Sequence, residues 1–509
     1  MSQNVKPQWL VKLTADATWE MYGAAITAVV VAYYVSTKVW RRSLPPGPTP
    51  LPILGSALGI LGQPLYVTFE KLRQQYGDVF CIRVGSKNIV VINGYEAITE
   101  ALVTNSRKFS GRPAITWTGV TEGHGFFSLS GPVYHQQKGV IMEILSGISW
   151  NKKEATELRI QKSAANLIAW LEEKVGEPVD PHVYLNTAVC NVNTEPVMGL
   201  TFAPTDDLMV AVSKIAMEIF IDAGAQNVNN YFTFLRHLPG DPTNYKVLVN
   251  NAMAAKKVVI GVIQSHKEKF EENPTAERAD FIDHYLQKLE SGADPSCTEK
   301  QLIAVVLDLF AMAIEAPATS LRWAILLACK HPEAQKQIQH EIDTVMKGEA
   351  PALQHQPEMH YTNAFIHEVQ RYVNLASINL PHATTDNVTF RGYSIPKGTI
   401  VIPNLASIHF DSQTYAEPRV FKPERFLSSG AFQKPKEFMP FSAGTRVCPG
   451  ANIGRWLLFL FLTTILQRFS VRLEGGVGAD KYGLIRFPGD FKAVFDERGQ
   501  KANAVNGTG

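Results

Sequence analysis

The 509-residue chain carries little net charge and few cysteines. Its 49 Lys and Arg residues nearly balance its 47 Asp and Glu residues, which leaves a net charge of +2. This balance argues against nucleic acid as the main partner, because nucleic-acid-binding domains carry a marked positive excess. The five cysteines are scattered and odd in number, so they do not suggest a disulfide framework, and the body of the protein is expected in a reducing compartment. The sequence also contains no internal repeat and no low-complexity tract.

Charge is absent from one stretch near the amino end. Residues 21–37 are uncharged and rich in Ala, Val, Ile and Tyr, at the short end of what spans a bilayer. Lys38, Arg41 and Arg42 follow this stretch, whereas Lys6 and Lys12 before it are balanced by acidic neighbours. Positive charge accumulates on the cytoplasmic side of a membrane helix. The amino terminus is therefore expected in the lumen and the body in the cytosol.

The rest of the chain is mostly helical in pattern. Residues 45–48 read PPGP, a stiff break after the apolar stretch. Alternating runs at 79–84 and 88–92 predict paired strands. Residues 152–310 predict successive helices, and residues 301–329 predict a long apolar helix interrupted by Pro317. The sequence thus predicts a mainly α fold with small β-sheets and no second domain boundary.

The most informative motif lies near the carboxyl end, where residues 441–450 read FSAGTRVCPG. Gly444 permits a tight bend, and a helical pattern begins directly after Cys448. A thiolate near a helix amino terminus and an arginine is expected to have a lowered pKa and to suit a metal. The alternative is a buried structural cysteine, the usual state of a lone Cys.

This motif resembles the haem-binding loop of the cytochrome P-450 family, and the likeness extends from about residue 45 to 496. The resemblance implies that Cys448 is the axial ligand of the iron of haem b and that Arg446 binds a haem carboxylate. Phe441 would shield the sulfur from water. Gly450 and Gly454 share a helix face, which lets that face approach a flat ring.

Three further features match the family. Glu368 and Arg371 form its E-x-x-R motif, and Arg425 belongs to its P-E-R-F loop; in the family these three residues form a buried structural triad. Tyr134 and Lys138 stand where the family has W-x-x-x-R, and both can still donate to a haem carboxylate. His382 is a further candidate for such a contact, although a lone His is more often a plain polar residue.

One departure from the family bears on mechanism. Oxygen-activating members carry A-G-x-(D/E)-T on the long central helix, where the acid and the threonine relay protons. Aligning residues 321–323, which read LRW, with the family's T-L-R-W places Glu315 on the acid, Ala313 on the glycine and Ala316 on the threonine. Sliding the register to use Thr319 instead would leave Glu315 unmatched. The relay hydroxyl is therefore expected to be missing, and the candidate catalytic positions are Glu315, Ala316 and Ala313.

Pro317 follows directly and cannot donate a hydrogen bond to the Ala313 carbonyl. A proline inside a helix costs on the order of 3 kcal/mol and is expected to kink it. Water or a substrate hydroxyl could satisfy the freed carbonyl. The alternative is that Ala316 and Pro317 are packing choices without consequence.

The resemblance implies a membrane-anchored haem-thiolate monooxygenase acting on a steroid, fatty acid or xenobiotic. Electrons would come from NADPH through a membrane-bound reductase, with cytochrome b5 as a further candidate partner. Two alternatives remain open. One is a haem-thiolate isomerase or dehydratase of lipid hydroperoxides or endoperoxides, which needs no relay threonine. The other is a non-catalytic haem or lipid binder.

The same resemblance implies a single-pass protein of the endoplasmic reticulum membrane with a cytosolic catalytic domain. Residues 1–20 would be lumenal, 21–37 the transmembrane anchor, 38–48 a basic and proline-rich hinge, and 49–509 one haem-thiolate domain. Substrate contacts are expected from three segments: residues 112–125, 209–235 and 378–379. The aromatic residues of these segments suggest an apolar cavity. They are Trp117, Phe220, Phe232 and Phe234.

Overall fold

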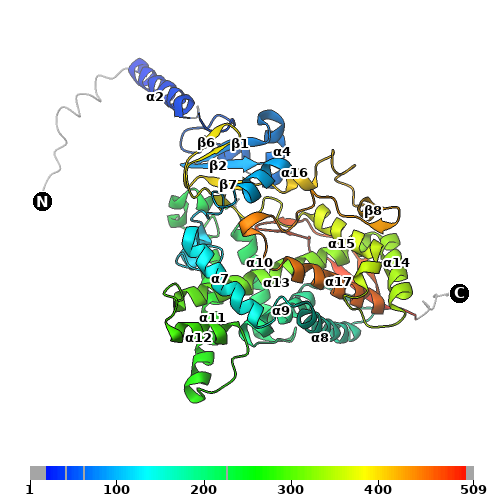
Figure 1. The fold of residues 1–509 in the computed structure, drawn as a ribbon. Coiled ribbons are helices and arrows are strands. Elements are labelled where there is room, and N and C mark those ends of the chain that lie inside the picture. Colours follow the sequence, from blue (N-terminus) through cyan, green and yellow to red (C-terminus); the bar gives the residue numbers. More distant parts are fainter. Residues whose placement is uncertain (1–18, 41–42, 61–62, 225–226, 500–509) are drawn as a thin grey trace.

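The computed structural model describes residues 19–40, 43–60, 63–224 and 227–499. Helices form most of this structure, and the sheets of the described residues are small (Figure 1). The predicted fold class, mainly α with small β-sheets, is confirmed. The helices are α2(Trp19–Trp40), α3(Ala57–Ile60), α4(Leu65–Tyr76), α5(Tyr95–Thr99), α6(Thr116–Val120), α7(Gly131–Gly147), α8(Lys153–Glu172), α9(His182–Met198), α10(Asp207–Asp222), α11(Tyr245–Glu272), α12(Phe281–Ser291), α13(Glu299–Lys330), α14(Pro332–Glu341), α15(His360–Val373), α16(Ala406–His409) and α17(Ala451–Arg468).

Short 3-10 and π turns join several of these helices. The π turns are η1(Glu100–Thr104) and η4(Ile342–Met346). The 3-10 turns are η2(Val228–Asn230), η3(Thr233–His237), η5(Gln356–Glu358), η6(Pro423–Phe426) and η7(Gly444–Arg446).

The largest sheet has the strand order β1-β2-β7-β4. Its strands are β1(Val79–Val84), β2(Lys87–Ile92), β7(Ile400–Pro403) and β4(His382–Ala383), with β2 and β7 parallel and the other neighbours antiparallel. β1 spans its predicted residues and β2 begins one residue earlier. The smaller sheets are β10(Phe469–Glu474), β13(Lys492–Glu497) and β3(Pro178–Val179); β11(Lys481–Tyr482) and β12(Arg486–Phe487); β5(Val388–Phe390) and β6(Tyr393–Ile395); β8(Leu427–Ser428) and β9(Ala431–Phe432).

Helix α13 runs through the centre of the molecule and packs against α9, α11 and α17 (Figure 1). Thr298 caps it by accepting a hydrogen bond from the Gln301 N–H at 3.1 Å. The helix continues past Pro317, so the expected interruption is wrong, whereas the kink expected at the proline stays a prediction. Tertiary packing holds the helix together, since Ile314, Ala318 and Leu321 on either side of the proline are fully buried.

Helix α2 stands apart from the body of the protein and meets it near the β1–β2 sheet (Figure 1). It includes the predicted anchor, 21–37, and extends beyond it at both ends. Its apolar side chains have little protein to pack against: Ile26 is 65% exposed and Val35 is 56% exposed. Lipid would cover such a surface favourably. Two other helices, α11 and α13, also have the length and composition to cross a membrane, but α13 is a buried core helix.

Candidate functional site

The cysteine loop is bent so that Cys448 ends directly before α17. Gly444 opens η7 with φ +74°, and a Cβ at this position would collide with the Leu102 carbonyl of η1. Only glycine meets both demands. The loop closes through the Cys448 N–H, which donates to the Phe441 carbonyl at 3.1 Å.

The Cys448 side chain is exposed because it lines a large internal cavity. Contrary to the sequence expectation, the pKa of its thiol is raised, because burial of the thiolate outweighs the Gly450 N–H and the charge of Arg455. Arg455, and not Arg446, is the cation that acts on the sulfur. A metal ion would reverse this balance, since a coordinating thiol is deprotonated outright.

A cavity lies beside Cys448. It lies between the cysteine loop and the start of α17 on one side and the middle of α13 on the other. Gly450 and Gly454 form part of its wall, and no side chain projects there from either position. Phe441 also lines it, so the cavity has room for a flat ring against an apolar wall.

Two arginines at one end of the cavity have no carboxylate partner among the described residues. Arg446 donates to the carbonyl oxygens of Ser110, Phe126 and Leu129. Arg112 donates to the Leu380 and Pro381 carbonyls, and its Nε has no partner. Burial together with the charge of Arg446 lowers the pKa of Arg112 to about 9, and burial lowers that of Arg446 to about 10.

Uncompensated buried cations are costly unless an anion joins them. A group that combines carboxylates, a flat ring and a metal ion would fit this site. Its carboxylates would pair with the arginines, its ring would lie against the glycine-lined wall, and its metal would bind the Cys448 sulfur. The residues present therefore fit haem b. The sequence places Arg112 only at the start of an expected substrate segment, residues 112–125, and does not indicate a contact with the cofactor.

Tyr134 and Lys138 are placed by α7 at the edge of the cysteine loop. The Tyr134 hydroxyl and the Lys138 ammonium both donate to the Thr445 carbonyl, at 3.1 and 2.8 Å. The Arg446 guanidinium lies over the Tyr134 ring, with its carbon 3.3 Å from the ring centroid. The two residues thus tie α7 to the loop, and their contact with a haem carboxylate remains a prediction.

His382 is buried, and its Nδ1 lies 2.7 Å from the Phe109 carbonyl, to which it donates. Burial and the charges of Arg112 and Arg446 hold its pKa well below the ordinary value, so the ring is neutral. Its contact with a haem carboxylate also remains a prediction.

Glu368, Arg371 and Arg425 meet as the sequence predicted. Arg371 binds the Glu368 carboxylate through two nitrogens, at 2.7 and 2.8 Å, and Arg425 Nε donates to the same carboxylate at 3.1 Å. Glu368 and Arg371 are fully buried. Arg371 also donates to the carbonyls of His409 and Pro418, so the triad fastens α15 to the chain that leads to the cysteine loop.

On α13, the cavity wall contains Met312, Ala316, Pro317 and Ser320. Ala316 thus presents a methyl group where the family alignment expects a hydroxyl. Glu315 is fully buried and hydrogen-bonded to Thr319 on the far side of the wall. The side chain of Ala313 lies outside the described residues.

Trp117 and Phe220 line a smaller apolar pocket that shares Arg112 and Phe127 with the cavity beside Cys448. Phe232 and Phe234 do not. Phe232 packs against the β1–β2 turn, where its ring lies near Gly85, and Phe234 is 58% exposed. Their aromatic character therefore reflects packing and surface, not the cavity.

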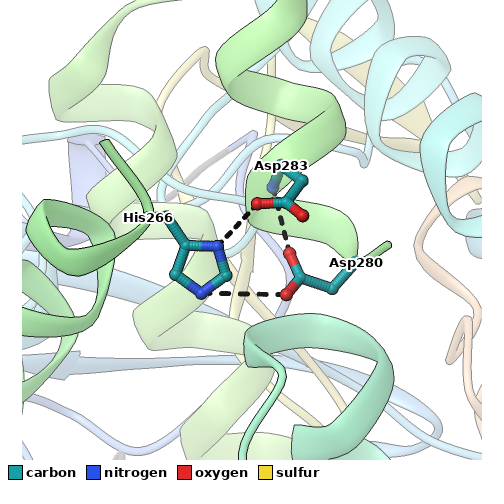
Figure 2. A group of neighbouring side chains, drawn as sticks. All are labelled: His266, Asp280 and Asp283. Atoms are coloured by element: carbon teal, nitrogen blue, oxygen red, sulfur yellow. Dashed lines mark hydrogen bonds and ion pairs between the residues drawn. The ribbon is translucent and has the colours of Figure 1, made fainter. Parts of the chain in front are cut away.

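A second cluster of possible metal ligands joins α11 to α12, formed by His266, Asp280 and Asp283 (Figure 2). His266 Nδ1 lies 2.7 Å from Asp283 Oδ1, and its Nε2 lies 3.7 Å from Asp280 Oδ2. Lys269 Nζ donates to the other Asp283 oxygen at 3.1 Å. Cationic side chains already occupy these acceptors, so the cluster is a set of ion pairs that holds α11 and α12 together. We call it the latch.

The comparisons with known proteins agree with this geometry. The Cytochrome P450 family model matches residues 45–484. The chain is 37% identical over 441 residues to Cytochrome P450 2C20 of Macaca fascicularis, covering 85% of this chain and 89% of the relative. It is 38% identical to Cytochrome P450 2C1 of Oryctolagus cuniculus (85% and 90% covered). It is 33% identical to Cytochrome P450 2E1 of Rattus norvegicus (88% and 93% covered).

Proposed function

The chain belongs to the cytochrome P450 family, and from that premise we propose that it oxygenates a lipophilic substrate without a relay hydroxyl at Ala316. Membership makes it a haem-thiolate monooxygenase of the endoplasmic reticulum membrane. Its cofactor is haem b, and its electrons come from NADPH through the membrane-bound reductase, with cytochrome b5 as a further candidate donor. The substrate class and the proton route are the proposed parts.

When bound, the haem supplies the iron at which O₂ is activated. Cys448 would hold it from one face, and Arg446 and Arg112 would hold its carboxylates. Phe441 would keep water from the sulfur. On the opposite face, Ala316 would leave space beside the reacting centre but could not hold or pass a proton.

The observation that carries the substrate proposal is an apolar pocket that adjoins the cavity beside Cys448 and shares Phe127, Phe220 and Met312 with it. The wall of this pocket also includes Trp117 and Ala311. Removing apolar surface from water stabilises binding by about 25 cal/mol per Å². A steroid, a fatty acid or an apolar xenobiotic would bury most of its surface there.

A single reconstitution tests the proposal. The full chain is incorporated into vesicles with NADPH reductase and offered testosterone, lauric acid and biphenyl under ¹⁸O₂. We expect product that carries one ¹⁸O atom and depends on NADPH. Heat-inactivated reductase is the matched control.

One observation favours a second candidate, an isomerase or dehydratase of lipid hydroperoxides or endoperoxides. Ala316 and Pro317 together form the cavity wall where a relay would stand, and such chemistry needs no relay. Conversion of linoleic acid hydroperoxide under argon, without any ¹⁸O product under oxygen, would replace the monooxygenase proposal. Absence of both activities in haem-loaded protein would leave a non-catalytic binder.

A further inference from the structure

A buried polar cluster lies on the side of α13 that faces α9, away from the cavity. Its centre is Glu315, which is fully buried. The Thr319 hydroxyl donates to Glu315 Oε1 at 3.1 Å, and the Asn186 amide donates to Oε2 at 3.3 Å. His182 Nε2 lies 3.9 Å from Oε1. The carboxylate is therefore held by groups behind the cavity wall.

The cluster reaches the protein surface at the start of α9. His182 is the first residue of that helix, and its side chain is 13% exposed. The neighbouring Asp180 is exposed and accepts a hydrogen bond from the His182 N–H at 2.9 Å. A chain of polar side chains thus runs from solvent through His182 to Glu315.

Two buried polar atoms in the cluster have no partner among the described residues. They are Asn186 Oδ1 and Arg322 Nε, on side chains that are 0% and 2% exposed. An unsatisfied buried polar atom costs about 1–3 kcal/mol, and buried water commonly satisfies such atoms. Burial lowers the pKa of Arg322, while the charges of Asp180, Glu315 and Asp490 raise it. Polar atoms and charges thus surround Arg322, the setting in which ordered water is stable.

We propose that this cluster is a hydrated proton inlet that enters at His182 and ends at Glu315, replacing the relay missing at Ala316. The inference rests on the proposed monooxygenase function. That reaction consumes two electrons and two protons for each O₂, and one oxygen atom goes to the substrate and the other to water. Both protons come from solvent, and the methyl group of Ala316 cannot pass them to the cavity.

The hydrogen bonds indicate how a proton would move. The Asn186 amide nitrogen lies 3.1 Å from His182 Nε2 and donates to it, as it does to Glu315. His182 Nε2 is therefore the unprotonated acceptor in the resting arrangement. A proton that binds Nε2 displaces this hydrogen bond, and the carboxylate of Glu315, whose Oε1 lies 3.9 Å from Nε2, can accept it. His182 then returns to its starting form.

The remaining step crosses α13 near Pro317. The proline provides no N–H to the Ala313 carbonyl, so this turn offers an acceptor for one water between Glu315 and the cavity. Ala316, the residue next to Glu315, is in the cavity wall. A proton that leaves through that water returns Glu315 to its starting form.

The test compares His182→Gln with wild type, using lauric acid as the probe in the reductase vesicles. Gln keeps a polar side chain but cannot carry a proton. We expect NADPH-driven product to fall about tenfold or more, with more electrons lost as superoxide and hydrogen peroxide. The solvent isotope effect on turnover should rise. His355→Gln is the matched control, because His355 also lies beside a glutamate, with 3.4 Å between His355 Nε2 and Glu349 Oε2, but outside this cluster.

Hydrogen peroxide separates proton supply from substrate binding, because it brings reduced oxygen that is already protonated. Peroxide-driven oxidation of lauric acid should be the same in His182→Gln and wild type. Equal losses with both oxidants, or an unchanged NADPH-driven rate, would overturn the inlet. If wild type forms no product with either oxidant, the proposed function itself has failed.

A structural measurement tests the same inference without turnover. An experimental structure of the full chain should contain ordered water bonded to Asn186 Oδ1 and Arg322 Nε. Direct protein partners for both atoms would overturn the hydrated inlet.

Discussion

At the scale of single residues, the arginines at the end of the cavity explain why the protein needs an anionic cofactor. Burial and the charge of Arg446 lower the pKa of Arg112, and burial lowers the pKa of Arg446. Without an anion the pair is a cost to the fold, and with one it becomes a binding site. The contribution of these arginines to stability thus changes from unfavourable to favourable when an anion binds. A structural ion pair such as Glu368 with Arg371 needs no ligand.

The Arg112→Leu variant tests that statement. Removing one of two unpaired cations should raise the melting temperature of the haem-free protein. The same change should weaken haem binding about 10- to 100-fold, the usual worth of a charge-assisted hydrogen bond. Haem titration and thermal unfolding measure the two effects. Arg107→Leu, at an exposed position, should change neither, and unaltered haem affinity in Arg112→Leu would contradict the assignment.

Ala316 allows a second prediction at this scale. Ala316→Thr places a hydroxyl on the cavity wall and should raise the fraction of NADPH electrons recovered in product by about twofold or more. Product and hydrogen peroxide are measured together in the reductase vesicles. Ala318→Thr adds the same group at a buried position away from the cavity and serves as the control. Unchanged peroxide release in Ala316→Thr would contradict the role given to the missing hydroxyl.

At the scale of elements, the latch between α11 and α12 has a pH dependence that can be worked out. Burial lowers the pKa of His266, but Asp283 and Asp280 outweigh it and raise this pKa. The pKa of Asp283 is lowered to about 2, and burial raises that of Asp280 to about 6. The stability due to His266 is complete below its unfolded pKa of about 6.5 and is lost as pH rises through the higher folded value. The stability due to Asp283 is present above its unfolded pKa and is lost only as pH falls towards 2.

His266→Gln should therefore destabilise the protein more at pH 6 than at pH 9. The expected loss at pH 6 is about 1–3 kcal/mol, the range for a hydrogen bond to a charged group. Chemical unfolding at the two pH values measures it, with His340→Gln on the exposed face of α14 as the control. An equal loss at both values would mean that His266 is not charged in the latch.

Most elements were predictable because their patterns are local. A few neighbouring residues are enough to predict β1, from its alternating apolar residues, and the cysteine loop, from its glycines and proline. The continuity of α13 past Pro317 could not be predicted, because buried contacts from other helices support that turn. The link from His182 to Glu315 is of the same kind: it exists only because α9 packs along α13.

The candidate site divides in the same way. Cys448, Gly444 and the triad could be predicted because each sits in a dense motif. The role of Arg112 could not be predicted, since the residues around it in the sequence indicate neither its burial nor the absence of an acidic partner. The raised pKa of the Cys448 thiol also escaped prediction, because desolvation depends on all the atoms around the sulfur.

At the scale of the whole molecule, apolar surface gathers where α2 meets the body. Ile53 is 81% exposed and Leu58 is 61% exposed on the chain before α4, and Phe234 is 58% exposed on η3. These segments border the same β1–β2 hairpin, since Gly55 approaches Arg83 and Gly85 approaches Phe232. Lipid contact would cover this surface together with α2.

Deleting residues 1–40 should leave a folded protein that still binds membranes weakly. Flotation with phosphatidylcholine vesicles should show reduced but measurable binding that resists high salt, because it is apolar. Adding Ile53→Asp and Leu58→Asp to the truncated protein should abolish it. Exposed Leu158, on α8, gives the control Leu158→Asp. Complete loss of binding on truncation alone would assign all membrane contact to α2.

The central claim is that the Cys448 sulfur is the axial ligand of the haem iron. The most direct measurement is the carbon monoxide difference spectrum of the reduced, haem-loaded protein, compared between wild type and Cys448→Ser. Wild type should give the long-wavelength band of a thiolate-ligated haem, and the variant should lack it. A thiolate-type spectrum that persists in Cys448→Ser would contradict the account.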